Sequence, residues 1–246
     1  MKKTIVITGA KQGIGKAIAE HFASLGYNLV INDKEDIKKL EGVKMELIKK
    51  YNIEVLSCFG DVSQENYVNL MFKEVISKFK TVDAVVNNAG IVEDMDVNVR
   101  SVELFNKTLT NNATSVFAMS KIFGQHMFNN KSGRIVNISS TNGDQTLYPT
   151  SIDYDASKAA INNLTKNFAI EFAPYVLVNA IMPGWVMTEM NEQLDADFLE
   201  SERKRILLGD FTTPQEIANV VEFLVSEKST AITGAILAVD GGLSLN

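Results

Sequence analysis

The sequence predicts an α/β fold, with a doubly wound, seven-stranded parallel sheet covered by helices on both faces. Two observations carry this prediction. Short runs rich in Val and Ile alternate with longer stretches of helical period, and the runs lack the apolar–polar alternation of a sheet with one solvated face. The expected strands lie at residues 4–7, 29–31, 55–56, 84–86, 135–138, 176–181 and 235–239.

Length and composition favour one domain across residues 1–246. The chain is 46% hydrophobic, which is enough to build a single core of this size, and no linker or repeat divides it. Strand–helix–strand units in series form right-handed crossovers, so the arrangement is Rossmann-like.

Charge and cysteine content exclude several classes of protein. The net charge is -6, and a mildly acidic chain lacks the basic surface that nucleic-acid binding needs. Cys58 is the single cysteine and is expected to be a buried thiol, which favours a cytoplasmic location. No apolar stretch is long enough for a membrane span, and no His, Cys and carboxylate cluster has metal-ligand spacing.

Residues 189–210 form a less regular, charge-rich stretch after the sixth predicted strand. We interpret them either as a helical flap that covers the substrate or as an ordinary surface connection. Both interpretations stay open at this point.

A glycine-rich turn links the first predicted strand to the helix that follows. Glycines at 9, 13 and 15 let the backbone turn tightly and approach a pyrophosphate, while the helix N-terminus supplies N–H groups and a positive dipole end. The position between strand and helix at the start of a βαβ unit predicts a dinucleotide site. Its candidate cofactor-binding residues are Gly9, Gln12, Gly13, Ile14 and Gly15.

Asp33 ends the second predicted strand, 18 residues after Gly15. That spacing suits a carboxylate that hydrogen-bonds the adenosine ribose hydroxyls, and the same charge repels the extra phosphate of NADP. The sequence therefore favours NAD. NADP stays the alternative, because the ammonium group of Lys11 or Lys34 has the length to reach a 2′-phosphate.

Several motifs in order make the chain resemble a short-chain dehydrogenase/reductase. They are Thr-Gly-x-x-x-Gly-x-Gly at 8–15, Asn-Asn-Ala-Gly at 87–90, Tyr-x-x-x-Lys at 154–158 and Pro-Gly-Trp-Val-Met-Thr at 183–188. The resemblance implies cofactor contacts at Asp61, Val62, Asn88, Gly90, Tyr154, Lys158, Val186 and Thr188. It also implies a homotetramer, since the matching C-terminal region usually helps to form one in this family.

Tyr154 and Lys158 lie one turn apart on a predicted helix and share a face. A nearby ammonium stabilises a phenolate, so we expect Lys158 to lower the pKa of Tyr154. The resemblance assigns the roles: Tyr154 exchanges a proton with the substrate oxygen, Lys158 also holds the nicotinamide ribose, and Ser140 hydrogen-bonds the substrate oxygen. The family pattern of Asn five residues before Phe selects Asn112 over Asn111 as the fourth catalytic residue.

The resemblance implies hydride transfer between NAD(H) and a small carbonyl or secondary-alcohol substrate. Substrate contacts are expected at Asn142, Asp144, Gln145 and Trp185, with Ile91 and Val92 nearby. The 3-oxoacyl-acyl-carrier-protein reductases usually carry an arginine where this chain has Gln12 or Asp33. An NADPH-dependent reductase of that kind and a catalytically silent nicotinamide sensor remain the alternatives, and the substrate stays open.

Overall fold

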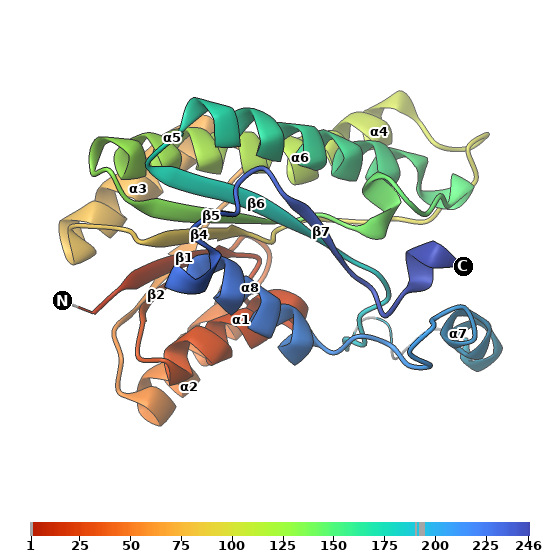
Figure 1. Ribbon diagram of the computed structural model, residues 1–246, viewed down its shortest axis with the longest axis horizontal. Helices are drawn as coiled ribbons and strands as arrows, with labels where there is room; N and C mark the ends of the chain where they lie inside the picture. Colours follow the sequence, from red (N-terminus) through yellow and green to blue (C-terminus); the bar gives the residue numbers. More distant parts are fainter. Residues whose placement is uncertain (1, 190, 192–194) are drawn as a thin grey trace.

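The computed structural model describes residues 2–189, 191 and 195–246, and it forms a single parallel sheet in the order β3-β2-β1-β4-β5-β6-β7 (Figure 1). Each of the seven predicted runs lies within or overlaps a strand, so the predicted fold class is confirmed. The strands are β1 (Thr4–Thr8), β2 (Asn28–Asp33), β3 (Val55–Phe59), β4 (Ala84–Asn87), β5 (Gly133–Ile138), β6 (Val176–Pro183) and β7 (Ile236–Val239).

The helices cover both faces of the sheet. Their bounds are α1 (Gly13–Ser24), α2 (Ile37–Tyr51), α3 (Glu65–Phe79), α4 (Val102–Leu109), α5 (Ser115–Asn129), α6 (Ile152–Glu171), α7 (Ala196–Arg203) and α8 (Pro214–Val225). Figure 1 shows α3 to α6 above the sheet and α1, α2 and α8 below it. One apolar core lies in each layer, with Phe22 fully buried below the sheet and Phe123 fully buried above it.

Polar caps fix where several helices begin. The Asp36 side chain accepts a hydrogen bond from the backbone N–H of Lys39 at the start of α2, and Thr213 and Glu216 form a reciprocal capping box at the start of α8. His21 lies 2.6 Å from the Glu222 carboxylate and joins α1 to α8.

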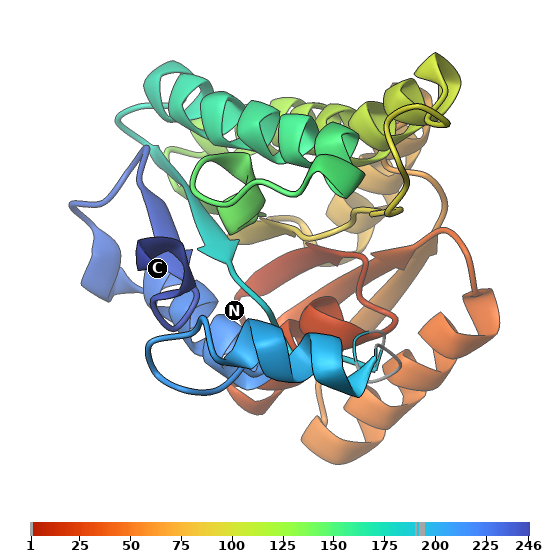
Figure 2. The ribbon, with the colours of Figure 1, turned by 90° about the vertical axis from the view of Figure 1, so that its right-hand side faces the viewer.

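Strand β1 lies between β2 and β4, so the direction of winding reverses there. Ligands of open α/β sheets bind beside the carboxyl ends of the strands at such a point. Figure 2 looks onto that edge, and α7 lies across the lower half of the view. A ligand is therefore expected to bind among the segments that follow β1, β2, β4, β5 and β6.

Three other expectations concern the whole chain. Cys58 is buried, as predicted, and burial raises the pKa of its thiol to about 12. In the part of the chain that the structure describes, no group of three or more His, Cys, Asp or Glu side chains is placed to hold a metal ion. None of the described helices combines the length and hydropathy needed to cross a bilayer.

Candidate active site

The glycine loop turns tightly into α1 because two of its residues lack side chains. Gly9 has a φ of +66°, which favours glycine, and a Cβ on Gly15 would lie 2.2 Å from the Gly9 carbonyl oxygen. Asn88 holds the loop from β4, since its Nδ2 donates to the carbonyls of Thr8 and Gly9 at 2.9 and 3.1 Å. Gln12 gives α1 no side-chain cap, which leaves the first amides of the helix available to a phosphate.

The segment after β6 lies next to this loop. A Cβ on Gly13 would lie 3.7 Å from the methyl group of Thr188, so the structure brings these two predicted cofactor residues together. Val186 is buried and pairs with Thr212 in an isolated bridge. Ile14 packs against the lower core. The start of α1 and the 186–188 segment thus lie side by side.

Asp33 is already engaged by its neighbours. Its Oδ1 accepts hydrogen bonds from the backbone N–H groups of Lys34 and Glu35 and lies 3.2 Å from Lys11 Nζ. Lys11 Nζ also lies 2.5 Å from Glu35 Oε2. Burial opposes the charge of Lys11, but these two carboxylates outweigh burial and raise its pKa. The charge of Asp33, on which the NAD prediction depends, is therefore largely offset by Lys11.

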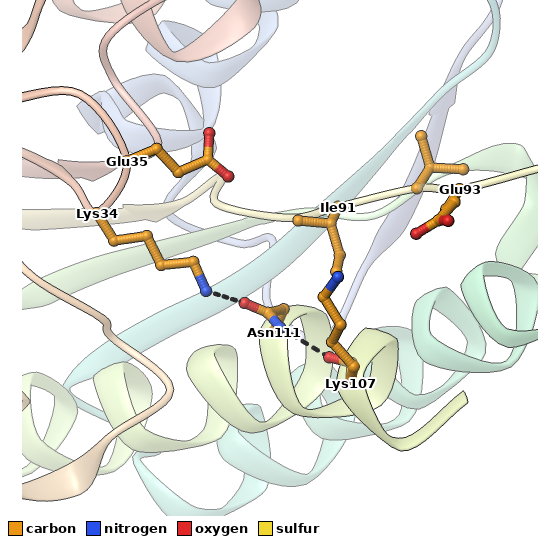
Figure 3. A pocket seen from close by; sticks show the side chains of 7 residues that line it. Lys34, Glu35, Ile91, Glu93, Lys107 and Asn111 are labelled. Atoms are coloured by element: carbon orange, nitrogen blue, oxygen red, sulfur yellow. Dashed lines mark hydrogen bonds between the residues drawn. The ribbon is translucent and has the colours of Figure 1, made fainter. Parts of the chain in front are cut away.

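A cavity of about 260 Å³ opens beside Lys34 (Figure 3). Lys34 Nζ bonds to Asp61 Oδ2 at 3.0 Å and to Asn111 Oδ1. Asn111, which the sequence places second to Asn112, thus belongs to this cavity rather than to the catalytic group. Lys107 and Glu35 also line the cavity, and Val62, which follows Asp61, is buried.

Ser140, Tyr154 and Lys158 meet where β5 ends and α6 begins. Tyr154 is half-buried, and the Ser140 hydroxyl lies close enough to lower the pKa of its phenol. The buried Nζ of Lys158 lies 5.3 Å from the centre of the Tyr154 ring and donates to the carbonyl of Ile138 at 2.9 Å. The structure therefore brings the three predicted catalytic residues together.

The direction of the Tyr154 pKa differs from the sequence-based expectation. Burial raises the pKa of Tyr154 to about 12; the Ser140 hydroxyl lowers it in part, and the charges of Asp155 and Asp94 raise it further. Burial also lowers the pKa of Lys158 to about 8. The expected lowering of the Tyr154 pKa was wrong for the protein without ligands, because the Lys158 ammonium bonds to a backbone carbonyl instead of the phenol. Tyr154 is a neutral proton donor in this state.

Asn112 sits fully buried in a π-helical turn, Thr110–Thr114, that joins α4 to α5. Its Oδ1 accepts from the backbone N–H of Ile91 at 2.7 Å, and its Nδ2 donates to the Ile91 carbonyl and to Ser157 Oγ, both at 2.9 Å. A Cβ on Gly90 would lie 3.2 Å from Asn112 Oδ1 and 3.8 Å from Lys158 Nζ. Asn112 thus lies near Lys158, with Gly90 between them.

Of the residues expected to contact substrate, one lies next to Ser140 and others are exposed. Asn142 lies next to Ser140, with which it exchanges hydrogen bonds. Asp144 and Gln145 are exposed, and in the part of the chain that the structure describes neither side chain hydrogen-bonds to another candidate residue. Ile91 is half-buried and Val92 is exposed, both at the rim of the cavity beside Lys34.

Trp185 joins a cluster that sequence reasoning missed. The buried carboxylate of Glu202 on α7 accepts from Trp185 Nε1 and from the hydroxyl of Tyr148, both at 2.8 Å. Arg205 NH1 lies 2.8 Å from the same carboxylate and 2.9 Å from the Tyr148 hydroxyl. Residues 190 and 192–194 of the predicted flap lie outside the described residues, but α7 is joined to both the β6 loop and the segment before Tyr154.

Comparisons with known proteins agree with this geometry. A family model described as enoyl-(acyl carrier protein) reductase matches residues 9–244. The chain is 35% identical to the 3-oxoacyl-[acyl-carrier-protein] reductase FabG of Aquifex aeolicus, over 98% of this chain and 97% of that protein. It is also 35% identical to glucose 1-dehydrogenase 2 of Bacillus subtilis, over 99% of this chain and 95% of that protein.

Among solved structures, ElxO with NADP bound has a TM-score of 0.92 at 32% identity, and the match covers 100% of both chains. The predicted preference for NAD finds no support in these relatives, since the cofactor named here is NADP. The matches extend over almost the whole chain. The chain therefore belongs to the short-chain dehydrogenase/reductase family of oxidoreductases.

Proposed function

We propose that this protein transfers a hydride between a nicotinamide dinucleotide and a carbonyl or secondary-alcohol carbon, with Tyr154 as the proton donor or acceptor. One observation carries the proposal. Ser140, Tyr154 and Lys158 converge at the carboxyl edge of the sheet, beside a glycine loop in which a side chain on Gly15 would clash. A proton donor next to a dinucleotide cradle is what carbonyl reduction requires.

The residues present fit a dinucleotide. Its pyrophosphate would be held by the glycine loop and the uncapped start of α1, and Thr188 and Val186 would hold the nicotinamide end. The bound cofactor supplies the hydride, and the protein supplies position and protons.

Different side chains then bind the substrate oxygen and protonate it. Ser140 donates a hydrogen bond to that oxygen as negative charge develops on it, and Tyr154 delivers the proton. The Lys158 ammonium stabilises the phenolate that remains. Asn112, which is hydrogen-bonded to Ser157 and to the Ile91 backbone, holds the π-helical turn against α6. In this position it lies near Lys158, through which a proton would return to the Tyr154 phenolate.

The cofactor end favours NADP(H) over the NAD(H) expected from Asp33. Three lysines, Lys11, Lys34 and Lys107, act on the single exposed carboxylate of Glu35 and lower its pKa, the bond with Lys11 having the largest effect. Figure 3 shows Lys34 and Lys107 lining the cavity below Glu35. A 2′-phosphate that displaced Glu35 would gain the same three cations. The relative with NADP bound adds to this argument.

Two substrate classes follow from the relatives. A 3-oxoacyl thioester is favoured by the FabG proteins, and a sugar or polyol is favoured by glucose 1-dehydrogenase 2. We propose that residues 189–210 act as a flap over either substrate, because Glu202 joins α7 to Tyr148 and Trp185.

The homotetramer implied by the family resemblance also remains a proposal. Apolar side chains of the matching C-terminal region are exposed in the single chain, with Leu237 at 42% and Leu245 at 80%. A mass of four chains in sedimentation equilibrium is expected.

Absorbance at the reduced-nicotinamide band tests the function. NADH and NADPH are supplied separately against acetoacetyl-coenzyme A, small keto acids, gluconolactone and cyclic ketones, and alcohols are tested in reverse. We expect turnover with NADPH that is lost in Ser140→Ala. Tight NADPH binding without turnover of any compound would instead favour a nicotinamide-sensing protein.

A further inference from the structure

Asp155, which follows Tyr154 on α6, makes more hydrogen bonds than a solvated helix residue. Its Oδ1 accepts from Asn142 Nδ2 at 2.7 Å and from Ser151 Oγ at 3.1 Å, and its Oδ2 accepts from the backbone N–H of Tyr148 at 3.1 Å. All three partners belong to the segment that precedes α6. One carboxylate therefore holds this segment against the helix that carries the proton donor.

Asn142 continues the chain of hydrogen bonds to Ser140. Its Oδ1 accepts from Ser140 Oγ at 3.3 Å and from Thr146 Oγ1 at 3.2 Å, while its backbone N–H donates to Ser140 Oγ at 3.2 Å. An ionised carboxylate only accepts, so Asp155 must face the Nδ2 of Asn142, and Oδ1 must face Ser140. The carboxamide has one orientation as a result.

That orientation holds Ser140 Oγ from two sides. The Ser140 hydroxyl donates to Asn142 Oδ1, and its oxygen accepts from the Asn142 backbone N–H. A reversed carboxamide would offer Ser140 an N–H group in place of an acceptor and would point a carbonyl oxygen at the Asp155 carboxylate.

We propose that Asp155 is a positioning residue that fixes, through the carboxamide of Asn142, the place of the Ser140 hydroxyl beside Tyr154. The proposal rests on the proposed function, since it assigns the Ser140 hydroxyl to the substrate oxygen. A substrate oxygen then finds Ser140 Oγ already in position next to the proton donor.

The charge of Asp155 acts on Tyr154 as well. The charged groups around Tyr154 are Asp155 and Lys158 on α6 and Asp94 in the loop after β4; the two carboxylates raise its pKa. Arg100 pairs with the buried Asp153 and neutralises it. Removing the charge of Asp155 therefore lowers the pKa of Tyr154, whereas removing the Asn142 side chain leaves that charge in place.

Steady-state kinetics of Asp155→Asn and Asn142→Ala separate the two effects. The substrate is whichever of the carbonyl compounds proposed for the activity test is reduced fastest. Both variants should lose about tenfold in kcat, a part of the usual general-acid contribution, with a smaller change in KM. Only Asp155→Asn should move the alkaline limb of the kcat/KM profile for reduction to lower pH. Glu171→Gln, an exposed carboxylate at the far end of α6, is the matched control.

The same comparison has a readout that needs no substrate. The tyrosinate absorbance of Tyr154, taken as the difference between each protein and its Tyr154→Phe counterpart, should rise at lower pH in Asp155→Asn than in the wild type. Wild-type kcat and an unmoved tyrosinate transition in folded Asp155→Asn would overturn the proposal. Failure of the proposed function would show differently, as wild-type protein that reduces nothing or as Tyr154→Phe that keeps full turnover.

Discussion

Arg100 and Asp153 form a 2.6 Å ion pair in which both side chains are almost fully buried, at 3% and 0% exposure. Asp153 precedes Tyr154 and accepts from its backbone N–H at 2.9 Å, and Arg100 donates to the carbonyls of Glu93 and Thr150. The pair thus joins the loop after β4 to the start of α6, the helix that carries Tyr154.

Breaking this pair should destabilise the fold. Asp153→Ala leaves the Arg100 charge buried without its partner, and we expect a loss of roughly 3–5 kcal/mol in the free energy of unfolding. Urea unfolding followed by circular dichroism measures it. The double variant Asp153→Ala with Arg100→Met should recover part of the loss, because no buried charge remains. A single variant as stable as the wild type would show that the pair does not hold this region.

Lys158 should make stability depend on pH. Burial lowers its pKa from 10.5 to about 8. Between these values the unfolded chain binds a proton that the folded chain has released, so the free energy of unfolding rises with pH across that window. The rise should reach about 3 kcal/mol at most, and it should be absent in Lys158→Met. Urea unfolding at several pH values between 7 and 10 tests this, with the exposed Lys166→Met as control. A parallel rise in Lys158→Met would refute the assignment.

Glu35 should oppose the binding of NADPH. In Glu35→Gln the lysines around that side chain lose one competing carboxylate, so NADPH should bind about tenfold tighter, which corresponds to roughly 1.4 kcal/mol, while NADH binding hardly changes. Titration of protein fluorescence with each nucleotide gives both dissociation constants. Glu103→Gln, an exposed carboxylate on α4, controls for overall charge. An equal gain for NADH would place the 2′-phosphate elsewhere.

Glu202 should keep α7 docked on the site. Glu202→Gln exchanges one carboxylate oxygen for a donor and removes the charge that Arg205 faces, at a cost of roughly 1–3 kcal/mol. Hydrogen exchange of the α7 amides should become about tenfold faster, since local opening follows that cost, and KM should rise with little change in kcat. Glu200→Gln, exposed on the same helix, is the matched control. Unchanged exchange in Glu202→Gln would mean that other contacts hold the helix.

The sequence was sufficient for the fold because its signals are local. Runs of Val and Ile mark strands covered on both faces, and the Gly9 to Gly15 spacing marks the turn into the first helix. The pairing of Tyr154 with Lys158 follows from helical spacing alone, and Ser140 needed only the family motif to be placed beside them.

The rest depends on contacts that no local pattern announces. Tyr148 meets Glu202 across 54 positions of sequence, and an isolated Glu on a helix resembles any solvated residue. The direction of the shift in the Tyr154 pKa could not be predicted from the sequence either, because it depends on how deeply the folded chain buries the phenol. Asp155 likewise has no local signal, because its partners lie in the segment that folds against the start of α6.

Replacement of Tyr154 by Phe tests the central claim most directly. The variant keeps the ring and loses only the hydroxyl, so NADPH should bind as in the wild type while kcat/KM for the best carbonyl substrate falls about 10²–10⁴-fold, the usual contribution of a general acid. Stopped-flow reduction under single-turnover conditions separates the chemical step from product release. A rate that stays at the wild-type value in Tyr154→Phe, with cofactor bound, would contradict the account.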